Sequence, residues 1–325
     1  MGLTLYIAVL LAAIPLSQGH FAFVRVAFNG EWQAPSRFIR NKTTPYYEDW
    51  TPNTNVNLRR YIDPTYASDR PESVRCGRGN MAHAADTEVL TVHAGDTIEV
   101  AHVREDPEYW AAEVAWDNCP DGRGSCYQPA GLYQQPMDIN HPGPFLAHLS
   151  KVPDGQDIHA YDGSGGWIKI YTLGLEMTDD AEQPVHWLAW DGDRAANGSY
   201  TLPSRSESAA AANSAQFVFN IPKQTPQGEY LLRFDMIWAG MNWPGVSQSP
   251  AQIYATCAQI QVESDVKGGT LPVGVQIPED LSHTSPGMAT SLEMYNSKQL
   301  DADYVYPGGP LWDGVTSMQD KPAPR

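Results

Sequence analysis

Hydrophobic and polar residues alternate with a period of two in several stretches of the chain, as in strands with one buried face. FAFVRVAF at residues 21–28 is the first, and VLTVHAGDTIEVAHV at 89–103 predicts a strand, a turn at Ala94-Gly95-Asp96 and a second strand. Four more strands are expected in GWIKIYTLGL, AQFVFNIP, GEYLLRFDMIW and AQIYATCAQIQVES. No stretch has a convincing period of 3.6, so the pattern predicts an all-β protein.

Long polar, proline-rich and aromatic loops separate these strands, at residues 31–75, 104–140, 191–213 and 239–250. Many short strands joined by long loops are typical of an immunoglobulin-like or fibronectin-like antiparallel β-sandwich. After Ser264 the long apolar runs stop and turn residues become frequent. We expect residues 265–325 to be an extension that packs on the domain or is partly disordered, with no separate carbohydrate-binding module.

The N-terminus carries a different pattern, the apolar run LYIAVLLAAIPL followed by Ser17 and Gly19. This arrangement predicts a secretory signal peptide over residues 1–19. Cleavage after Gly19 would leave a mature chain that begins with His20, and a sandwich domain over residues 20–264. No later stretch is apolar enough to predict a membrane span, so we expect a secreted, extracellular protein without a membrane partner.

The composition of the chain limits the classes of molecule that it could bind. The 325-residue chain has a formal net charge of −17, which should repel nucleic acid and anionic lipid. A neutral polymer such as polysaccharide remains compatible, and the 10 Trp and 16 Tyr residues could contribute to an aromatic surface. The sequons NKT at Asn41 and NGS at Asn197 are candidate glycosylation sites of a secreted chain.

Four cysteines are an even number in a chain expected to be secreted, so two disulfides are the default. Three pairings are possible. A Cys119–Cys126 bond would close the short loop CPDGRGSC, and Cys76–Cys257 would then join an early segment to a late one. A zinc site is disfavoured because no CxxC spacing is present.

The candidate chemistry begins at His20. A histidine at a free N-terminus offers its α-amine and its ring Nδ1 to one metal ion, and a nitrogen from a second histidine completes a three-nitrogen set that suits copper. In INHPGPFLAHL, His141 opens a stiff H-x-G-P turn before an expected strand. His148 is its rival, but it lies in an apolar run.

A third signal is AQIYATC, at residues 251–257. In a strand, Gln252 and Tyr254 point to the same face, and Cys257 points to the other. An amide and a phenol side by side near a metal could orient a small oxygen species and cap an axial position. An ordinary half-buried strand with polar tips is the alternative.

These signals, in this order, resemble the fungal lytic polysaccharide monooxygenases of auxiliary activity family 9, formerly glycoside hydrolase family 61. The resemblance runs through His20, HAGDTIEV, HPGP, WIKIYTLGL, IPKQTPQGEYLLRFDMI, AQIYATC and LPVGVQIPEDLSHTSPGM. It implies one copper ion per chain, held by the amine and Nδ1 of His20 and by Nε2 of His141. Tyr254 would be the axial tyrosine and Gln252 the glutamine that hydrogen-bonds an oxygen species.

The resemblance also implies a monomer that uses an external electron donor and O2 or peroxide to cleave a β-1,4-glucan such as cellulose at C1 and/or C4. The disulfides of the family are similar to Cys76–Cys257 and Cys119–Cys126. Aromatic side chains could stack on sugar faces, and the candidates are Tyr46, Tyr47, Trp50, Tyr304 and Tyr306.

The chain departs from the family in three places. Gly240 stands where the family has a histidine near the copper. The stretch at residues 103–140 is longer than the connection that the family usually has there, and the aromatic-rich region at residues 33–70 is expanded relative to the family. His148 or Asn242 could stand in for the missing histidine. The departure at Gly240 favours an alternative function, a secreted copper-binding protein on this scaffold without polysaccharide oxidation. A third possibility is a metal-free wall or adhesion protein.

Overall fold

A computed structural model gives the fold, and it describes residues 20–44, 46, 60–103, 107, 141–190, 217–241, 250–269 and 271–323. The expected signal peptide, Tyr47, Trp50, Cys119, Cys126, Asn197 and Asn242 lie outside these residues. Among the described residues, no helix is long and apolar enough to cross a membrane.

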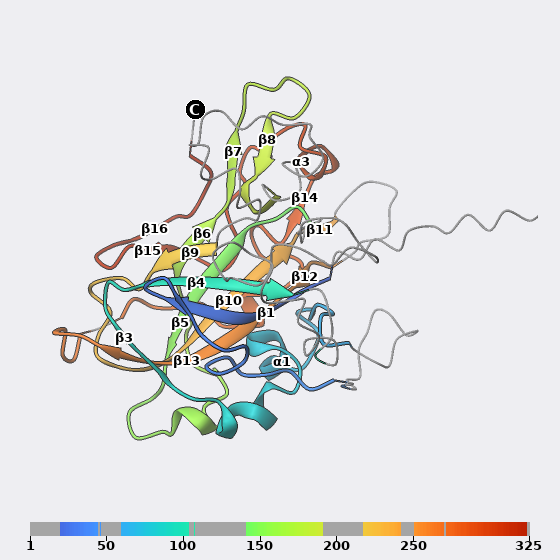
Figure 1. The fold of residues 1–325 in the computed structure, drawn as a ribbon. Helices are drawn as coiled ribbons and strands as arrows, with labels where there is room; N and C mark the ends of the chain where they lie inside the picture. Colours follow the sequence, from blue (N-terminus) through green and yellow to red (C-terminus); the bar gives the residue numbers. More distant parts are fainter. Residues whose placement is uncertain are drawn as a thin grey trace, which may run out of the picture.

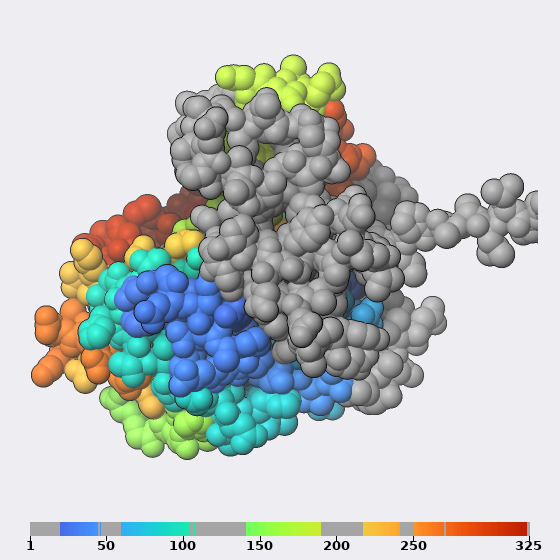
Figure 2. All heavy atoms as spheres, viewed as in Figure 1, coloured from blue at the N-terminus to red at the C-terminus, as the bar shows by residue number. Residues whose placement is uncertain are grey.

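The smaller of two main sheets has four antiparallel strands in the order β2-β1-β4-β9. They are β1 (Ala22–Phe28), β2 (Glu31–Trp32), β4 (Thr97–Val103) and β9 (Phe217–Asn220). The N-terminal part of the described chain, blue to teal, gathers on one face of the molecule (Figure 2).

The larger sheet has the order β16-β15-β6-β5-β10-β13-β3, and β12 pairs with the end of β10. Its pairs are antiparallel except β13 with β3 and β15 with β6. The strands are β3 (Leu90–His93), β5 (Phe145–Lys151), β6 (Ile168–Leu173), β10 (Gly228–Trp238), β12 (Gln252–Ile253), β13 (Thr256–Glu263), β15 (Leu311–Trp312) and β16 (Ser317–Met318).

Short elements complete the fold: two small sheets pair β7 with β8 and β11 with β14. These strands are β7 (Leu175–Met177), β8 (Val185–Trp187), β11 (Gly240–Met241) and β14 (Ala289–Thr290). The helical elements are α1 (Pro71–Cys76), η1 (Asn80–Asp86), η3 (Ile158–Ala160), η4 (Leu188–Trp190), η5 (Glu279–Leu281) and α3 (Leu292–Tyr295).

The two main sheets lie face to face (Figure 1), and their inner side chains form one core that includes Phe23, Phe145, Phe217 and Phe234. Burial of alternate residues on both sheets is the physical basis of a sandwich. The structure therefore confirms the expected β-sandwich, with two parallel pairings added to a mainly antiparallel fold.

The turn at Ala94-Gly95 has a consequence that alternation could not predict. The two strands that flank it do not pair: β3 lies in the larger sheet beside β13, and β4 lies in the smaller sheet beside β1. Gly95 has a φ of +105°, which favours glycine, and its amide donates to the carbonyl of Ile221. The turn thus carries the chain from one sheet to the other.

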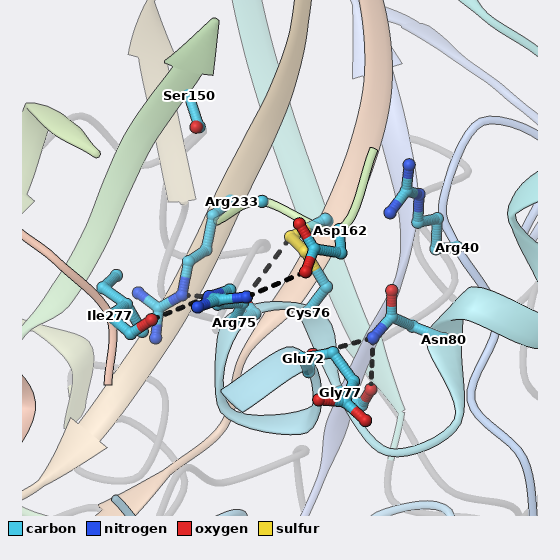
Figure 3. Close-up of a disulfide and its surroundings, with 12 residues drawn as sticks. Arg40, Glu72, Arg75, Cys76, Gly77, Asn80, Ser150, Asp162, Arg233 and Ile277 are labelled. Atoms are coloured by element: carbon cyan, nitrogen blue, oxygen red, sulfur yellow. Dashed lines mark hydrogen bonds and ion pairs between the residues drawn. A yellow bond between two sulfur atoms is a disulfide. The ribbon is translucent and has the colours of Figure 1, made fainter. Parts of the chain in front are cut away.

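A second core covers the outer face of the larger sheet, and the Cys76–Cys257 disulfide lies in it. The bond ties the end of α1 to β13 across 181 positions of sequence, as the resemblance implied. Figure 3 shows Arg75 beside it, where Nε donates to the carbonyl of Ile277 at 2.7 Å and Nη1 pairs with Asp162 at 3.2 Å. All described cysteines are in this bond.

The chain after Ser264 packs on the larger sheet where it is described. Strand β15 pairs with β6, and the buried Trp312 joins the core between the sheets. A buried ion pair of 2.7 Å joins Lys169 in β6 to Asp320. Lys169 also donates to the carbonyl of Pro307 at 2.8 Å, so this segment is an integral layer of the fold.

Candidate metal centre

Three aromatic side chains from distant parts of the sequence meet at one end of the sandwich. His20 directly precedes β1, His141 lies four residues before β5, and Tyr254 lies between β12 and β13. The ring centroids of His20 and His141 are 6.2 Å apart, those of His20 and Tyr254 6.0 Å, and those of His141 and Tyr254 5.6 Å. The fold therefore brings together the two histidines and the tyrosine that the sequence singled out.

The spacing of the two imidazoles suits one metal ion. A metal–imidazole bond is about 2 Å long and the ring nitrogen lies about 1 Å from the ring centre, so two rings on opposite sides of a metal have centroids about 6 Å apart. His20 is partly exposed, with 38% of its side chain accessible, whereas His141 is 6% exposed. The pair could hold a metal that remains accessible on the His20 side.

The third nitrogen depends on processing. In the uncleaved chain the α-nitrogen of His20 belongs to the peptide bond with Gly19, and it becomes an amine only if cleavage occurs there. Within the described ranges, no group of three or more His, Cys, Asp and Glu side chains is arranged to hold a metal. A three-nitrogen site here therefore requires the free N-terminus.

The HPGP turn fixes His141. A Cβ added to Gly143 would collide with the carbonyl oxygen of Ile237 at the end of β10, so only glycine allows this approach. The amide of Ile237 donates to the carbonyl of Pro144 at 3.1 Å. The next residue, Trp238, stacks on the imidazole of His141 at 4.2 Å with an interplanar angle of 5°. Sequence reasoning missed Trp238, because only the pairing of β10 places it there.

Tyr254 is held from two sides. Its ring stacks on Phe21 at 4.4 Å, and its hydroxyl donates to Oε1 of Gln252 at 2.6 Å. Burial raises its pKa well above the ordinary value, with Tyr66 and Asp63 adding to the shift. Tyr254 is therefore a protonated phenol at neutral pH. The expected shared face of Gln252 and Tyr254 agrees with this hydrogen bond, although β12 ends before Tyr254.

Sequence reasoning also missed Asp63, whose Oδ1 lies 2.9 Å from Nδ1 of His20. Burial raises the pKa of Asp63, but hydrogen bonds from His20 and from the amide of Arg60, together with the charges of His20 and Arg78, outweigh burial and leave the pKa below its ordinary value. The carboxylate is thus an anion beside the first histidine. No motif around Asp63 pointed to this contact.

The structure does not bring His148 into this site. His148 is fully buried in β5, its Nε2 lies 3.0 Å from the carbonyl of Gly308, and burial holds its pKa well below the ordinary value. It cannot stand in for the histidine that Gly240 replaces. Gly240 begins β11, and its amide donates to the carbonyl of Met288.

The structure describes three of the five aromatic residues that were candidates for stacking on sugars. Tyr46 is partly exposed and its hydroxyl accepts from Arg70 at 3.3 Å. The prediction that Tyr304 and Tyr306 lie on the surface and stack on sugars is wrong. They are 7% and 6% exposed, because both pack in a separate apolar cluster with Trp187. The sequon residue Asn41 is partly buried and accepts a hydrogen bond from the Tyr61 hydroxyl at 2.6 Å.

The model of Auxiliary Activity family 9, formerly GH61, matches residues 20–304, which include every residue of this site. The chain belongs to this family. The AA9 family lytic polysaccharide monooxygenase G of Aspergillus tamarii is 27% identical over 305 residues, which cover 93% of this chain and 69% of that protein.

Two solved structures share the AA9 fold with this chain. CvAA9A has a TM-score of 0.53 and 17% identity, over 91% of this chain and 99% of CvAA9A. A cellulose-active polysaccharide monooxygenase from M. thermophila has a TM-score of 0.50 and 20% identity, over 90% of this chain and 99% of that one. This AA9 chain is therefore a distant member of the family, 27% identical to the A. tamarii protein.

Proposed function

We propose that this AA9 protein is a secreted, copper-dependent lytic polysaccharide monooxygenase that cleaves a β-1,4-glucan such as cellulose at C1 and/or C4. The observation that carries the proposal is the convergence of His20, His141 and Tyr254, with ring centroids 5.6–6.2 Å apart. Family membership and the cellulose activity of the M. thermophila neighbour support it.

Each residue has a distinct task. The α-amine and Nδ1 of mature His20, with Nε2 of His141, would hold one copper ion, a donor set that suits this metal. Bound copper supplies the one-electron chemistry with O2 or peroxide that removes a hydrogen atom from the sugar. Buried Tyr254 would remain a protonated phenol beside the copper, and its hydroxyl donates a hydrogen bond to Oε1 of Gln252 at 2.6 Å. The Gln252 amide NH2 group could donate to an oxygen species, while the electron comes from an external donor.

Gly240 supports a second function, copper binding without polysaccharide oxidation. Gly240 has no side chain that could hold or donate a proton near the metal, and His148 is committed to the carbonyl of Gly308. If a proton donor is essential to the reaction, the site would bind copper and stop there. A Gly240→His variant that gains activity on a β-glucan would support this second function.

Mass spectrometry of soluble products tests the proposal. Copper-loaded mature protein would be incubated with amorphous cellulose and ascorbate, beside a matched protein with one alanine before His20. Oxidised cello-oligosaccharides from the native N-terminus alone are expected. Copper binding that requires His20 but yields no oxidised product from cellulose, xylan or xyloglucan would overturn the monooxygenase and leave the copper-binding protein.

A further inference from the structure

Two aromatic side chains lead away from the candidate metal centre on the side of His141. The indole of Trp238 lies parallel to the His141 imidazole, with ring centroids 4.2 Å apart and an interplanar angle of 5°. The ring of Tyr295 follows, 6.3 Å from that of Trp238 and tilted by 37°. Rings at these distances are in contact. His141 is 6% exposed, whereas Trp238 and Tyr295 are partly exposed, so the row connects a buried candidate ligand with side chains that reach solvent.

Backbone pairing holds this row in place. Trp238 is the last residue of β10 and pairs with Gln252 in β12. Two residues further on, β11 pairs with β14 in parallel, with Gly240 beside Ala289. Helix α3 follows β14 and ends at Tyr295. The pairing of β11 with β14 therefore places the helix, and with it the phenol of Tyr295, beside the indole of Trp238.

The chemistry of these two rings differs from that of the other side chains at the site. Indole and phenol rings give up one electron to a strong oxidant more readily than imidazole does, and electron transfer is fast between rings in contact. Copper supplies one-electron chemistry with oxygen, and an oxidising equivalent that meets no sugar has the metal ligands as its nearest target. A mild reductant cannot pass electrons through oxidised indole, so the row suits the discharge of a strong oxidant and not the reduction of Cu(II).

We propose that Trp238 and Tyr295 form an electron-transfer path that protects the metal ligands when the site is oxidised without a polysaccharide in place, an inference that rests on the proposed function. One oxidising equivalent at the site takes one electron from the indole of Trp238, which becomes a radical cation. The phenol of Tyr295 returns that electron to Trp238 and releases its proton to water. A small external reductant then gives one electron to the Tyr295 radical, which regains a proton from water, so one electron from the reductant discharges one oxidising equivalent.

The test follows radicals in mature, copper-loaded protein that is reduced with ascorbate and mixed with hydrogen peroxide in the absence of polysaccharide. Rapid-mixing absorbance and freeze-quenched electron paramagnetic resonance distinguish tryptophan from tyrosine radicals, and peptide mass spectrometry locates oxidised side chains. We expect Trp238→Phe to lose the tryptophan radical and to show several-fold more oxidation at His20 and His141. Tyr295→Phe should keep the tryptophan radical, which should persist several-fold longer because no phenol reduces it.

Trp187→Phe is the matched control, because Trp187 also lies beside a tyrosine, Tyr304, with ring centroids 6.0 Å apart. That pair belongs to the separate apolar cluster and not to the metal centre. The control should match wild type in both radicals and in histidine oxidation. The Cu(II) spectrum of each protein is recorded first, so that only fully loaded proteins are compared. Tyr295→Phe keeps the proposal testable if Trp238→Phe does not fold.

The outcomes separate this path from the proposed function. A tryptophan radical of equal yield in wild type and Trp238→Phe overturns the path, and so does equal oxidation of His20 and His141 in the two proteins. If wild-type protein and the variant with an alanine before His20 bind copper equally, the site at His20 fails and the proposed function fails with it. Oxidised cello-oligosaccharides from wild-type protein that shows no Trp238-dependent radical refute this inference alone.

Discussion

Trp238 and His141 lie face to face, and this contact sets the orientation of a metal-binding imidazole. The rings are 4.2 Å apart and nearly parallel, and Tyr295 lies next, with its ring centroid 6.3 Å from that of Trp238. Metal sites depend on residues that orient the ligands as well as on the ligands themselves. In this chain a stacked indole contributes to that orientation at His141.

Trp238→Ala should weaken copper binding because the imidazole of His141 loses the surface that holds it. We expect a several-fold rise in the Kd for Cu(II), and a loss of about 2 kcal/mol in the free energy of unfolding, because the deleted indole is partly buried against the core. Trp238→Phe keeps an aromatic face and should retain most of the affinity. Chelator competition and urea unfolding of the apoprotein measure the two effects, and equal Kd values in all three proteins would contradict the role.

Lys42 is buried, and its Nζ lies 5.9 Å from the centre of the Tyr61 ring. Burial lowers its pKa to about 7, with Arg78 adding to the shift and Asp63 opposing it. Between pH 7 and its ordinary pKa, the unfolded chain therefore binds more protons at this residue than the folded chain does. The contribution of Lys42 to stability should rise with pH over this range and be least favourable below pH 7.

Lys42→Met removes the buried amine that binds a proton. The variant should therefore raise the free energy of unfolding relative to wild type more at pH 6 than at pH 9. The measurement is urea unfolding of both proteins at the two pH values. The exposed Lys267→Met is the control, and its effect should be small and nearly the same at both. A Lys42→Met effect that does not depend on pH would contradict the shifted pKa.

At the scale of elements, the site is assembled where strands begin and end. Strand β10 ends at Trp238, beside the turn that presents His141, and its last residues pair with β12, which carries Gln252. The close approach of Gly143 to Ile237 joins this turn to β10. The register of β10 with its neighbours therefore decides the position of His141, a candidate metal ligand that does not itself lie in a strand.

Gly143→Ala should push the turn away from β10. We expect a loss of about 3 kcal/mol in the free energy of unfolding, because the new methyl group meets a backbone carbonyl that cannot turn aside. Copper affinity should fall as His141 moves. Gly155→Ala is the matched control: it has a φ of +82° and nothing within 4 Å of the added Cβ, so it should cost only about 1 kcal/mol. Equal losses in both variants would contradict the steric argument.

At the scale of the whole molecule, the C-terminal segment is held on the larger sheet by buried charge. Lys169 and Asp320 form an ion pair with 0% and 8% of their side chains exposed, and Asp320 also accepts from the hydroxyl of Thr172 at 2.6 Å. Burial lowers the pKa of Lys169 although Asp320 opposes the shift. Loss of one partner would leave the other buried without its countercharge.

Asp320→Asn should therefore cost about 3 kcal/mol of unfolding free energy and expose the C-terminal segment to proteolysis. Glu182→Gln, which removes one partner of the exposed Lys298–Glu182 pair, should change stability by less than about 1 kcal/mol. The double variant Lys169→Met/Asp320→Asn should recover part of the loss. Urea unfolding and limited proteolysis measure these effects, and similar stability of the two single variants would contradict the buried pair's role.

Alternation along the chain predicted most long strands closely, and β10 coincides with GEYLLRFDMIW at residues 228–238. It did not predict that β3 and β4 lie in different sheets. The period of a strand is local, whereas pairing depends on which distant segments cover the same core. The two tyrosines Tyr304 and Tyr306 show the same limit, because their burial comes from β7, β8 and the C-terminal segment packing together.

The sequence by itself determined the all-β fold and singled out His20, His141, Gln252 and Tyr254, because residue type, turn chemistry and two-residue periodicity are properties of short stretches. Only the tertiary structure decided that Asp63 contacts His20 from 43 positions away, and that Trp238 stacks on His141. Both contacts arise from the meeting of strand ends and loops at one end of the sandwich. The packing of the two main sheets on each other decides which strand ends and loops lie together, and no pattern within a short stretch of sequence encodes that packing.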